Sequence, residues 1–564
     1  MTTYQLADPI TPEVAKELAH LEPHVQQLLF RRGVHTKKDA DQFLSPNYET
    51  DLHDPALLHD IDAAVERILA TMKANEQIVV FSDYDCDGIP GGVIGYDFFT
   101  AIGYEQFSNY IPHRHYEGFG LSVEAVEKLA KEGAKLIITI DCGVTDVEAV
   151  ARANELGVAV IITDHHEPAA KLPEAVAVVN PKLGEYPFPD LCGAAVFFKL
   201  VQAVLTKGDF DVKPGWEKWW LDMVGVATIA DMVPLVGENR TLAHYGITVL
   251  RKSRRPGLQQ LLKKAKASQQ HLTEDDIGFT LGPRINAASR MDTPEDAFYM
   301  LATRDEGEAG ARVDHLEKLN QTRKTTVAQM TKEIHKRVND LTEIPDVIVM
   351  GNVEWRPALV GLAANKLAEE HSRPVFLWGR DGNGAIKGSA RAGGEVSVVK
   401  LMEAAADLFL EYGGHHASGG FTVKEEHTFT FGDELNQVYK AHGNDVVETH
   451  VETIDSHHSI HEPLTVLLKA QQQLAPYGVG NPKPLYGFKG VTPAQVEQFG
   501  KTKEHLKLLF ETDSGKVEAI AFFATAASFT KTAKVGEKLT LLAHLEQSFF
   551  MGRLQTRLRI VDIQ

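Results

Sequence analysis

The chain has 564 residues, of which 43% are hydrophobic and 24% are charged, and it carries a formal net charge of −19. This length exceeds what one hydrophobic core can serve, so we expect about three or four domains. The composition is that of an ordinary globular protein. The negative net charge argues against a protein that coats nucleic acid through bulk charge, although it leaves room for one that binds a strand in a local groove.

The first residues, MTTYQLADPI, contain neither the basic nor the apolar region of a signal peptide, and no apolar stretch of the chain is long enough to span a bilayer. We therefore expect a cytoplasmic protein that does not contact a membrane. The three cysteines, Cys86, Cys142 and Cys192, form no CxxC pair, so neither a disulfide framework nor a thiolate zinc site is indicated. We expect each of them to be a small core residue.

The N-terminal residues 1–49 are expected to form a helical segment, and from about residue 76 to 165 apolar strands alternate with amphipathic helices. The predicted strands are EQIVVFSD, AKLIITID and VAVIITDHH. Helices are expected near Gly92 to Thr100, over SVEAVEKLAKEG with Ser122 as its N-cap, and over VTDVEAVARANELG. Repeated β-α units with strands rich in Val and Ile predict an α/β domain with a parallel sheet covered by helices, over residues 50–304.

Three aspartates at alternate positions, Asp83, Asp85 and Asp87, follow the first predicted strand. In an extended segment they would share one face, where their charges repel one another unless a cation neutralises them. An acidic surface loop is the alternative, because Asp and Gly are common in turns. The apolar strand before them favours the first interpretation, since open α/β sheets bind ligands at the carboxyl ends of their strands.

Three further apolar runs also end in polar residues. LIITIDCG delivers Asp141, VIITDHHEP delivers Asp164, His165 and His166, and MVGVATIADMVPL delivers Asp231. A single aspartate in such a place is usually a turn or a cap, but four segments of this kind are hard to explain as turns. Because the strand ends of one parallel sheet lie at the same edge, we expect these groups to converge.

The rest of the chain is expected to form a connecting helix and two further domains. The charged segment from Asp305 to Leu341 has no proline, which predicts a long helix over residues 305–342, and a second α/β domain follows over 343–445. Five strand-like runs within 455–564 suit a small β-barrel of the oligonucleotide-binding (OB) type, or another small β-domain. Two basic clusters, RKSRRPGLQQLLKKAKA from Arg251 and RRGVHTKK from Arg31, are more often solvated faces than phosphate tracks.

Four motifs, DYDCDG, IDCG, TDHH and ATIADMVPL, stand in the chain in this order. In order and spacing they resemble the four metal-site motifs of the DHH phosphoesterase superfamily. IPHRHYEGFGLS, LCGAAVFFKL, LGPRINAASRM, GSARA, GGHHASGGF and LAPYGVGNPKPLY resemble segments of its RecJ family of single-strand-specific exonucleases. The resemblance runs from about residue 50 to the last residues, and it implies a DHH domain joined by the long helix to a DHHA1 domain and followed by an OB-like barrel.

The resemblance implies one or two divalent ions, Mn²⁺ or Mg²⁺, in the DHH domain. The implied ligands are Asp85, Asp87, Asp141, His165 and Asp231, with Asp83 as a ligand or close support. Asp141 would bridge two ions, Asp164 would orient the neighbouring imidazole, and His166 would face the scissile phosphate as an electrostatic stabiliser or proton donor. Independently of the resemblance, carboxylates with one imidazole suit Mn²⁺ or Mg²⁺ better than zinc, and the histidine favours Mn²⁺.

The resemblance also implies contacts to the substrate backbone and to a 5′-phosphate. The residues are Arg114, Ser389, Arg391 and one of Arg284 and Arg290, with Gly414 and His415 of GGHHASGG close to the strand. Arginine gives bidentate contacts to phosphate, while a surface or interdomain ion pair is the alternative for each arginine. In the barrel, Tyr486, Phe522, Phe549 and Phe550 are candidate stacking platforms or, alternatively, core residues.

Two segments depart from the family pattern. After Gly88 the family has a small hydroxyl residue, whereas this chain has IPGG, with Pro90 in the expected first helical turn, where proline is well tolerated. The sequence does not predict what the loss of this hydroxyl does to the hydrogen bonds behind the metal ligands. In WRPALVG, Arg356 replaces a family histidine and Ala358 a glycine, so no role of that histidine is carried over.

The activity implied by the resemblance is a metal-dependent 5′ to 3′ exonuclease that hydrolyses single-stranded DNA to 5′-mononucleotides in recombination and repair. One alternative is a phosphodiesterase for short oligonucleotides or small phosphoesters, which the basic segments and the β-rich tail disfavour. Another is a scaffold protein that has lost catalysis, which the four intact motifs disfavour. Besides single-stranded DNA, candidate partners are single-strand binding protein and a RecQ-type helicase, and we expect a monomer. Because the chain ends soon after RLRIVDIQ, we do not expect the family's partner-binding residues beyond the barrel.

Overall fold

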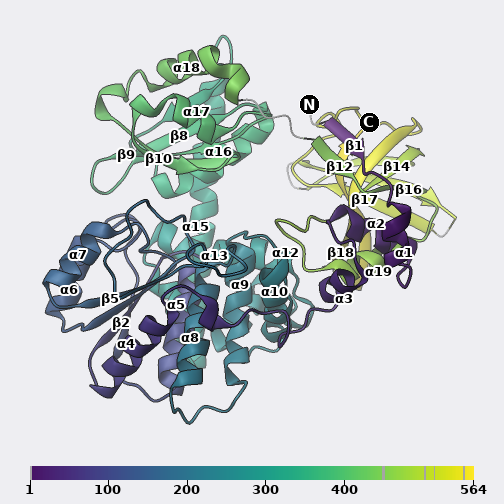
Figure 1. Ribbon diagram of the computed structural model, residues 1–564. Coiled ribbons are helices and arrows are strands. Elements are labelled where there is room, and N and C mark those ends of the chain that lie inside the picture. Colours follow the sequence, from purple (N-terminus) through teal and green to yellow (C-terminus); the bar gives the residue numbers. More distant parts are fainter. Residues whose placement is uncertain (1–2, 447–450, 501–502, 514, 551–552) are drawn as a thin grey trace. The chain divides into compact units, whose positions relative to one another are not determined.

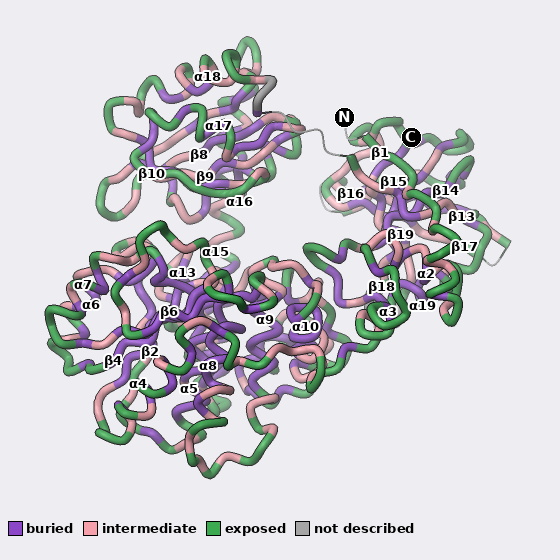
Figure 2. Tube along the Cα trace, in the orientation of Figure 1, coloured by how far each residue is buried: buried purple, intermediate pink, exposed green. Residues whose placement is uncertain are grey.

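The computed structural model of the protein (Figure 1) describes residues 3–446, 451–500, 503–513, 515–550 and 553–564. They form two compact units. The larger unit is Tyr48–Thr449, and the smaller one combines Met1–Asn47 with His450–Gln564. The smaller unit therefore joins residues from both ends of the sequence. Buried residues lie mainly along the strands and on the inward sides of the helices (Figure 2).

A five-stranded parallel sheet lies in the first part of the larger unit. Its order is β3-β2-β4-β5-β6, and its strands are β2 (Ile78–Ser82), β3 (Phe107–Tyr110), β4 (Leu136–Ile140), β5 (Ala159–Thr163) and β6 (Ala177–Val179). The register pairs Ser82 with Ile140 and Ile140 with Thr163, so β2, β4 and β5 end level with one another. All residues of β2 and β4 are buried, as expected for strands covered on both faces. The predicted parallel sheet is confirmed.

Helices cover the two faces of this sheet, and alternate strand residues face one layer or the other. Val80 packs in the cluster of α4 (Ile61–Lys73), α5 (Gly88–Ala101) and α8 (Gly193–Lys207), whereas Val79 and Phe81 pack with α6 (Val123–Lys131) and α7 (Val147–Glu155). Ser122 is the N-cap of α6, as predicted, and accepts from the N–H of Ala125 at 3.1 Å. Helix α5 begins four residues before the predicted start, because the first turn of a helix tolerates proline and glycine.

The remaining part of this domain is helical. After the short turn η2 (Trp216–Trp220) come α9 (Leu221–Ala230), α10 (Gly237–Leu250), α11 (Pro256–Ala265), the π-helical turn η4 (Ile277–Leu281), α13 (Gly282–Met291) and α14 (Glu295–Ala302). The apolar run before Asp231, which the sequence analysis grouped with strand ends, is helix α9. It is buried from Leu221 to Thr228, and a helix buried on all sides has no polar stripe to reveal its period.

The predicted long helix is α15 (Glu306–Asn339), 34 residues long. It leads into a mixed five-stranded sheet of order β10-β11-β9-β8-β7, made of β7 (Ile348–Gly351), β8 (Val375–Arg380), β9 (Ile386–Arg391), β10 (Phe409–Gly414) and β11 (Ser418–Val423). Helices α16 (Pro357–His371), α17 (Val398–Ala404) and α18 (Phe431–Val446) accompany this sheet. These elements form the predicted second α/β domain.

The smaller unit contains a seven-stranded sheet of order β13-β14-β18-β19-β17-β16-β15. Its strands are β13 (Ser456–His458), β14 (Leu485–Val491), β15 (Gln495–Phe499), β16 (His505–Thr512), β17 (Gly515–Ala521), β18 (Leu539–Phe550) and β19 (Arg553–Ile563). The five predicted runs correspond to β14 and β16 to β19, and β13 and β15 are additional.

The N-terminal residues belong to this smaller unit. Strand β1 (Thr3–Leu6) pairs in parallel with β12 (Val451–Ile454). Helices α1 (Pro12–Glu17), α2 (Pro23–Arg31) and α3 (Lys37–Leu44) lie nearby in sequence, and buried Leu28 and Leu29 of α2 pack on Leu474 of α19 (Leu464–Leu474). The basic cluster RRGVHTKK therefore has a structural use, because Arg31 pairs with Asp455 in this unit.

Two predictions made from composition can be compared with the structure. All three cysteines are free and buried, as expected of core residues. Within the described ranges, no helix combines the length and the apolar character needed to cross a membrane.

Candidate active site

Polar residues gather at one edge of the parallel sheet, where β2, β4 and β5 end. The backbone N–H groups of Asp83, Asp141 and Asp164 each donate to a carbonyl of the neighbouring strand, at 3.1, 3.0 and 3.1 Å. Strand pairing thus continues one residue beyond each strand and fixes the three residues at the same level. The structure brings together here all the predicted metal ligands and catalytic residues, which are Asp83, Asp85, Asp87, Asp141, Asp164, His165, His166 and Asp231.

Asp141 has a left-handed backbone, with φ of 62°. This conformation is uncommon for a residue other than glycine, and such residues cluster at functional sites. Its side chain lies directly against Gly193, the first residue of α8. A Cβ atom on Gly193 would lie 2.5 Å from the Cβ of Asp141, so only glycine fits at this position.

Asp87 precedes α5 and is bound by the first turn of α8. Its two carboxylate oxygens accept hydrogen bonds from the N–H groups of Gly193, at 2.6 Å, and Ala194, at 2.8 Å. A helix N-terminus favours a negative charge, because its N–H groups lack partners within the helix. Asp85 is held differently, since its Oδ1 accepts from the N–H groups of Asp87 and Gly88 at 2.8 and 3.2 Å. These contacts aim the two carboxylates before any ligand binds.

His165 lies at the centre of a second group of carboxylates. Its Nε2 is 3.1 Å from Asp141 Oδ1, 3.6 Å from Asp231 Oδ2 and 3.8 Å from Asp87 Oδ2. Asp231 reaches this place from the C-cap of α9. The imidazole therefore connects the strand-end carboxylates to a carboxylate from a helix.

His166 and Asp164 form a separate pair. His166 Nδ1 is 2.8 Å from Asp164 Oδ1, while Asp164 Oδ2 accepts from the N–H of Val144 at 2.9 Å. The Asp164 side chain is buried, whereas that of His166 is 45% exposed. Asp164 thus orients an imidazole that still reaches solvent.

Burial and mutual repulsion change the pKa values of these groups. Burial, followed by neighbouring carboxylates, raises the pKa of Asp87 to about 7 and that of Asp231 to about 9, and raises those of Asp83 and Asp141 well above their usual range. Asp164 differs: burial acts to raise its pKa, but hydrogen bonds and the charge of His166 outweigh burial and lower it. Such a site favours either protons or a cation.

The residues present fit a divalent cation. Among the described residues, the buried side-chain atoms without a hydrogen-bond partner include Asp83 Oδ1, Asp141 Oδ1 and His165 Nε2. A buried polar atom without a partner is costly, so three in one cluster fit a site whose side chains bind a cation. The potential ligand atoms form overlapping sets within 4.8 Å of one another: Asp83, Asp85 and Asp141; Asp87, His165 and Asp231; and Asp141, His165 and His166. Carboxylates with imidazole suit Mn²⁺ or Mg²⁺.

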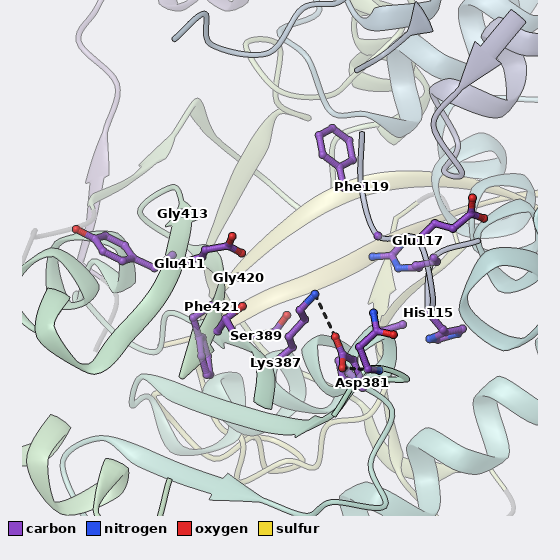
Figure 3. A pocket seen from close by; sticks show the side chains of 18 of the residues that line it. His115, Glu117, Phe119, Asp381, Lys387, Ser389, Glu411, Gly413, Gly420 and Phe421 are labelled. Carbon is purple, nitrogen blue, oxygen red and sulfur yellow. Dashed lines mark hydrogen bonds and ion pairs between the residues drawn. The ribbon is translucent and has the colours of Figure 1, made fainter. Parts of the chain in front are cut away.

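A groove of about 550 Å³ lies next to this cluster, between the first and second α/β domains of the larger unit. Tyr84, which stands between two of the clustered aspartates, lines it, as does Phe119, whose ring centre is 5.3 Å from that of His166. The segment with His115, Glu117 and Phe119 is separate from the strands that carry Lys387 and Ser389 (Figure 3). A ligand in the groove would therefore touch both domains.

Some predicted substrate-binding residues lie in or beside this groove. Arg114 and Ser389 line it, and the Arg114 guanidinium lies 4.7 Å from the centre of the Tyr84 ring. Arg391 lies close to Ser389, because a Cβ on Gly361 would touch both side chains. Gly414 and His415 lie at the β10–β11 turn and are exposed there, outside the lining of the groove.

The two alternative arginines of GPRINAASR have different surroundings. Arg290 donates to the carbonyl of Ala358, and burial, followed by the charge of Arg114, lowers its pKa to about 9. Arg284 instead pairs with Glu317 at 2.5 Å. An arginine crowded by other cations is suited to an anionic ligand, whereas Arg284 already has a carboxylate partner. The geometry favours Arg290.

Both departures from the family pattern have a structural context. Pro90 lies in the first turn of α5, and a Cβ on Gly91 would be 2.5 Å from Ile140 Cγ2, so α5 packs too closely on β4 for a side chain there. Arg356 donates to the carbonyl of Met291 at 3.0 Å and so connects the two α/β domains of the larger unit.

The candidate stacking residues of the OB-like domain differ in how far they are buried. Tyr486 is fully buried, so its assignment as a stacking platform is wrong and the alternative of a core residue holds. Phe522 is partly exposed, with the guanidinium of Arg559 4.3 Å from its ring centre. The side chains of Phe549 and Phe550 lie outside what the structure describes.

The residue motifs do not indicate that the N-terminus of α8 is part of the site. Gly193 and Ala194 contribute backbone N–H groups, which leave no signal in residue chemistry. The segment LCGAAVFFKL does place a glycine directly before an apolar helical run, and this pattern is the signal that was available.

Comparison with known proteins finds three family matches along the chain. The DHH family, N-terminal domain, matches residues 77–228, the DHHA1 domain matches 345–441 and the RecJ OB domain matches 454–562. The single-stranded-DNA-specific exonuclease RecJ of Bacillus subtilis is 30% identical over 549 residues, which are 97% of this chain and 68% of that protein. RecJ of Haemophilus influenzae is 31% identical over 526 residues, which are 89% of this chain and 89% of that protein.

Among solved structures, RecJ of Thermus thermophilus in complex with Mn²⁺ is similar over the whole chain. The TM-score is 0.82 at 27% identity, and the match covers 79% of that protein. The Mg²⁺ complex of the same protein matches with a TM-score of 0.75. The likeness thus extends over both α/β domains and the OB-like domain.

Proposed function

We propose that this chain, which belongs to the RecJ family of the DHH phosphoesterase superfamily, is a metal-dependent exonuclease that hydrolyses single-stranded DNA from its 5′ end to 5′-mononucleotides in recombination and repair. The observation that carries the proposal is the buried carboxylate and imidazole cluster, which opens beside a groove lined by two domains.

The cluster would hold one or two divalent ions, with Mn²⁺ as first choice. The residues that would hold them are Asp83, Asp85, Asp87, Asp141, His165 and Asp231. A bound divalent ion lowers the pKa of a water, neutralises charge that develops on phosphoryl oxygens and reverses the sign of an acidic pocket that otherwise repels phosphate. Asp141 belongs to two of the overlapping ligand sets and is therefore the candidate bridge.

His166 is the candidate proton donor to the leaving oxygen, or the stabiliser of charge on the attacked phosphoryl group. Burial acts to lower its pKa, but the hydrogen bond and charge of Asp164 outweigh burial and raise it. The raised pKa favours the imidazolium near neutral pH, which both roles require. Asp164 also fixes the ring orientation, so that Nε2 is the nitrogen left for the substrate.

The direction of digestion would come from a 5′-phosphate held beside the cluster. Arg114, Arg290, Ser389 and Arg391 are the candidate ligands for it. Arginine binds phosphate in a bidentate and therefore oriented way, which would place the first phosphodiester at the metal ligands. Selection of single strands would follow from a groove too narrow for a duplex.

We also propose that the protein works in the cytoplasm as a monomer, on strands that single-strand binding protein covers or that a RecQ-type helicase unwinds. The basis for these partners is the need for a supply of single-stranded DNA, and the test is co-sedimentation of the purified proteins.

Digestion of oligonucleotides labelled at one end, with Mn²⁺ present, tests the proposed activity. We expect label from the 5′ end to appear first as mononucleotide, from single strands but not from blunt duplexes. Label released only from the 3′ end, or equal digestion of duplex, would refute it. Faster turnover of dinucleotides than of long strands would favour the alternative phosphodiesterase. Asp141→Ala should abolish hydrolysis while strand binding persists.

A further inference from the structure

A second pocket, of about 350 Å³, opens on the larger unit away from the metal ligands. We call it the tryptophan pocket. Its lining is Asp97, Trp216, Trp219, Trp220, Asp222, Ser253, Arg254, Arg255 and Arg304. Three of the five tryptophans of the chain thus meet at one place. Trp220 is buried, whereas Trp216 and Trp219 are 48% and 41% exposed, which is unusual for the largest apolar side chain.

The floor of the pocket is a buried and fully paired ionic network. Arg255 donates to Asp222 Oδ2 at 2.8 Å and to Asp97 Oδ2 at 2.6 Å, and Ser253 also donates to Asp222, at 2.8 Å. Arg304 closes the network from the rim through Asp97 Oδ1 at 2.8 Å, although its side chain is 60% exposed. Charges that satisfy one another in this way form a rigid base for the two exposed rings.

Among the residues that the structure describes, Arg254 on the rim has no carboxylate partner. Three arginines but only two aspartates line the pocket. Arg254 is exposed, and within the described ranges its recorded contact is with the ring of Trp219, 6.0 Å from its centre. The basic run RKSRR thus divides: Arg251 donates to the carbonyl of Leu272, Arg255 is buried in the network, and Arg254 is left at the rim of the pocket.

We propose that the tryptophan pocket binds a nucleotide, with its base against Trp216 or Trp219 and its phosphate on Arg254. Aromatic faces stack on any base, and an arginine next to them supplies the charge that a phosphate needs. The size suits one nucleotide, because small-molecule sites begin at about 300 Å³. The choice of a nucleotide as ligand rests on the proposed function. Its source is either a released mononucleotide or a nucleotide within a strand, and both offer the same chemistry.

The pocket has a direct structural connection to the metal ligands. Helix α5 starts beside Asp87 and carries Asp97 about 15 Å further along its axis. Helix α9 carries Asp222 of the network in its first turn, and its C-cap is Asp231 of the metal cluster. A nucleotide that changes the geometry of the network would therefore act on two helices that adjoin metal ligands, Asp87 before the first turn of α5 and Asp231 after the last turn of α9.

Fluorine NMR of the full chain containing 5-fluorotryptophan tests the proposal. The resonances of Trp216 and Trp219 are assigned with Trp216→Phe and Trp219→Phe, and EDTA prevents digestion. Thymidine 5′-phosphate and an oligothymidylate are titrated separately. We expect at least one ligand to shift both resonances, and a response to the mononucleotide identifies the free product as the source. A response to the oligomer alone identifies the strand.

The affinity should depend on the pocket residues and not on nearby charge. At least one of Trp216→Ala and Trp219→Ala is expected to weaken binding about 5- to 150-fold, the factor that base stacking contributes, and Arg254→Gln about 10-fold. Lys252→Gln, an exposed cation outside the lining, is the matched control and should bind as the wild type does. Unshifted resonances with both ligands overturn the proposal. Mn²⁺-dependent digestion by the same preparation is measured separately, so failure of the pocket and failure of the proposed function are distinguishable.

Discussion

Gly193→Ala tests whether the close packing of α8 on Asp141 is needed for catalysis. The added Cβ would lie 2.5 Å from the Cβ and 2.7 Å from the Cα of Asp141, whereas carbon atoms in contact are about 3.5–4.0 Å apart. One backbone must therefore move by about 1 Å. A displacement of this size at a reacting centre lowers the rate about 100-fold, and overpacking costs about 1–3 kcal/mol of stability.

A second glycine variant serves as the control that separates the expected loss of rate from a general loss of stability. Gly95 lies in the middle of α5. In Gly95→Ala the added Cβ would be 3.2 Å from Val80 Cγ1 and 3.3 Å from Phe197 Cζ, which are the ends of side chains. A small adjustment suffices there, and the gain in helix propensity of about 0.5–1 kcal/mol offsets it.

The assay is initial-rate digestion of a single-stranded oligonucleotide at saturating Mn²⁺, combined with urea unfolding of each variant. We expect kcat to fall about 100-fold in Gly193→Ala and to stay near the wild-type value in Gly95→Ala. Wild-type kcat in a folded Gly193→Ala protein would show that the position of Asp141 tolerates a shift of this size, and the reasoning would fail.

Three further outcomes are expected. Asp164→Asn should lower kcat about 10²- to 10⁴-fold and shift the acid–base profile, because His166 loses the carboxylate that raises its pKa; an unchanged profile would contradict this. The pKa of Asp231 is raised to about 9 in the folded protein, against about 3.8 in the unfolded chain, so the folded state loses stability as its proton is released. In EDTA, the Tm should therefore fall as the pH rises from 7 to 9, and Mn²⁺ should remove that fall. A Tm in EDTA that does not change over this range would count against the prediction. Arg255→Gln should destabilise the protein by about 3–5 kcal/mol in urea, against less than about 1 kcal/mol for the exposed Arg304→Gln, and similar losses would disprove the difference.

The convergence of the strand ends was predictable because it depends on two properties that the sequence indicates, the burial of the strands and their parallel direction. Apolar runs followed by Asp83, Asp141 and Asp164 indicate buried parallel strands, and parallel strands end at one edge. The family motifs then added the roles, which stay predictions until they are measured. Asp231 came from the same rule although its run is a helix, since a buried helix and a buried strand are equally apolar in sequence.

Features made by backbone groups and long-range packing were not predictable. The left-handed backbone of Asp141 and the N–H groups of Gly193 have no signature in residue type. Tyr486 illustrates the opposite failure, because an aromatic residue in a strand suits a stacking platform and a core equally well, and only its full burial decides. The choice between Arg284 and Arg290 likewise depends on which of them meets Glu317, a residue of another helix.

The pairing of β1 with β12 has a consequence for how the chain folds and how it can be cut. Thr3 meets Val451, so the smaller unit is interrupted by the whole of Tyr48–Thr449. During synthesis the larger unit is therefore complete before the smaller one. The N-terminal helices of the smaller unit must wait for packing partners that leave the ribosome over 400 residues later. Because the inserted unit is attached at both Asn47 and Thr449, one proteolytic cut in either connection leaves the two units covalently linked.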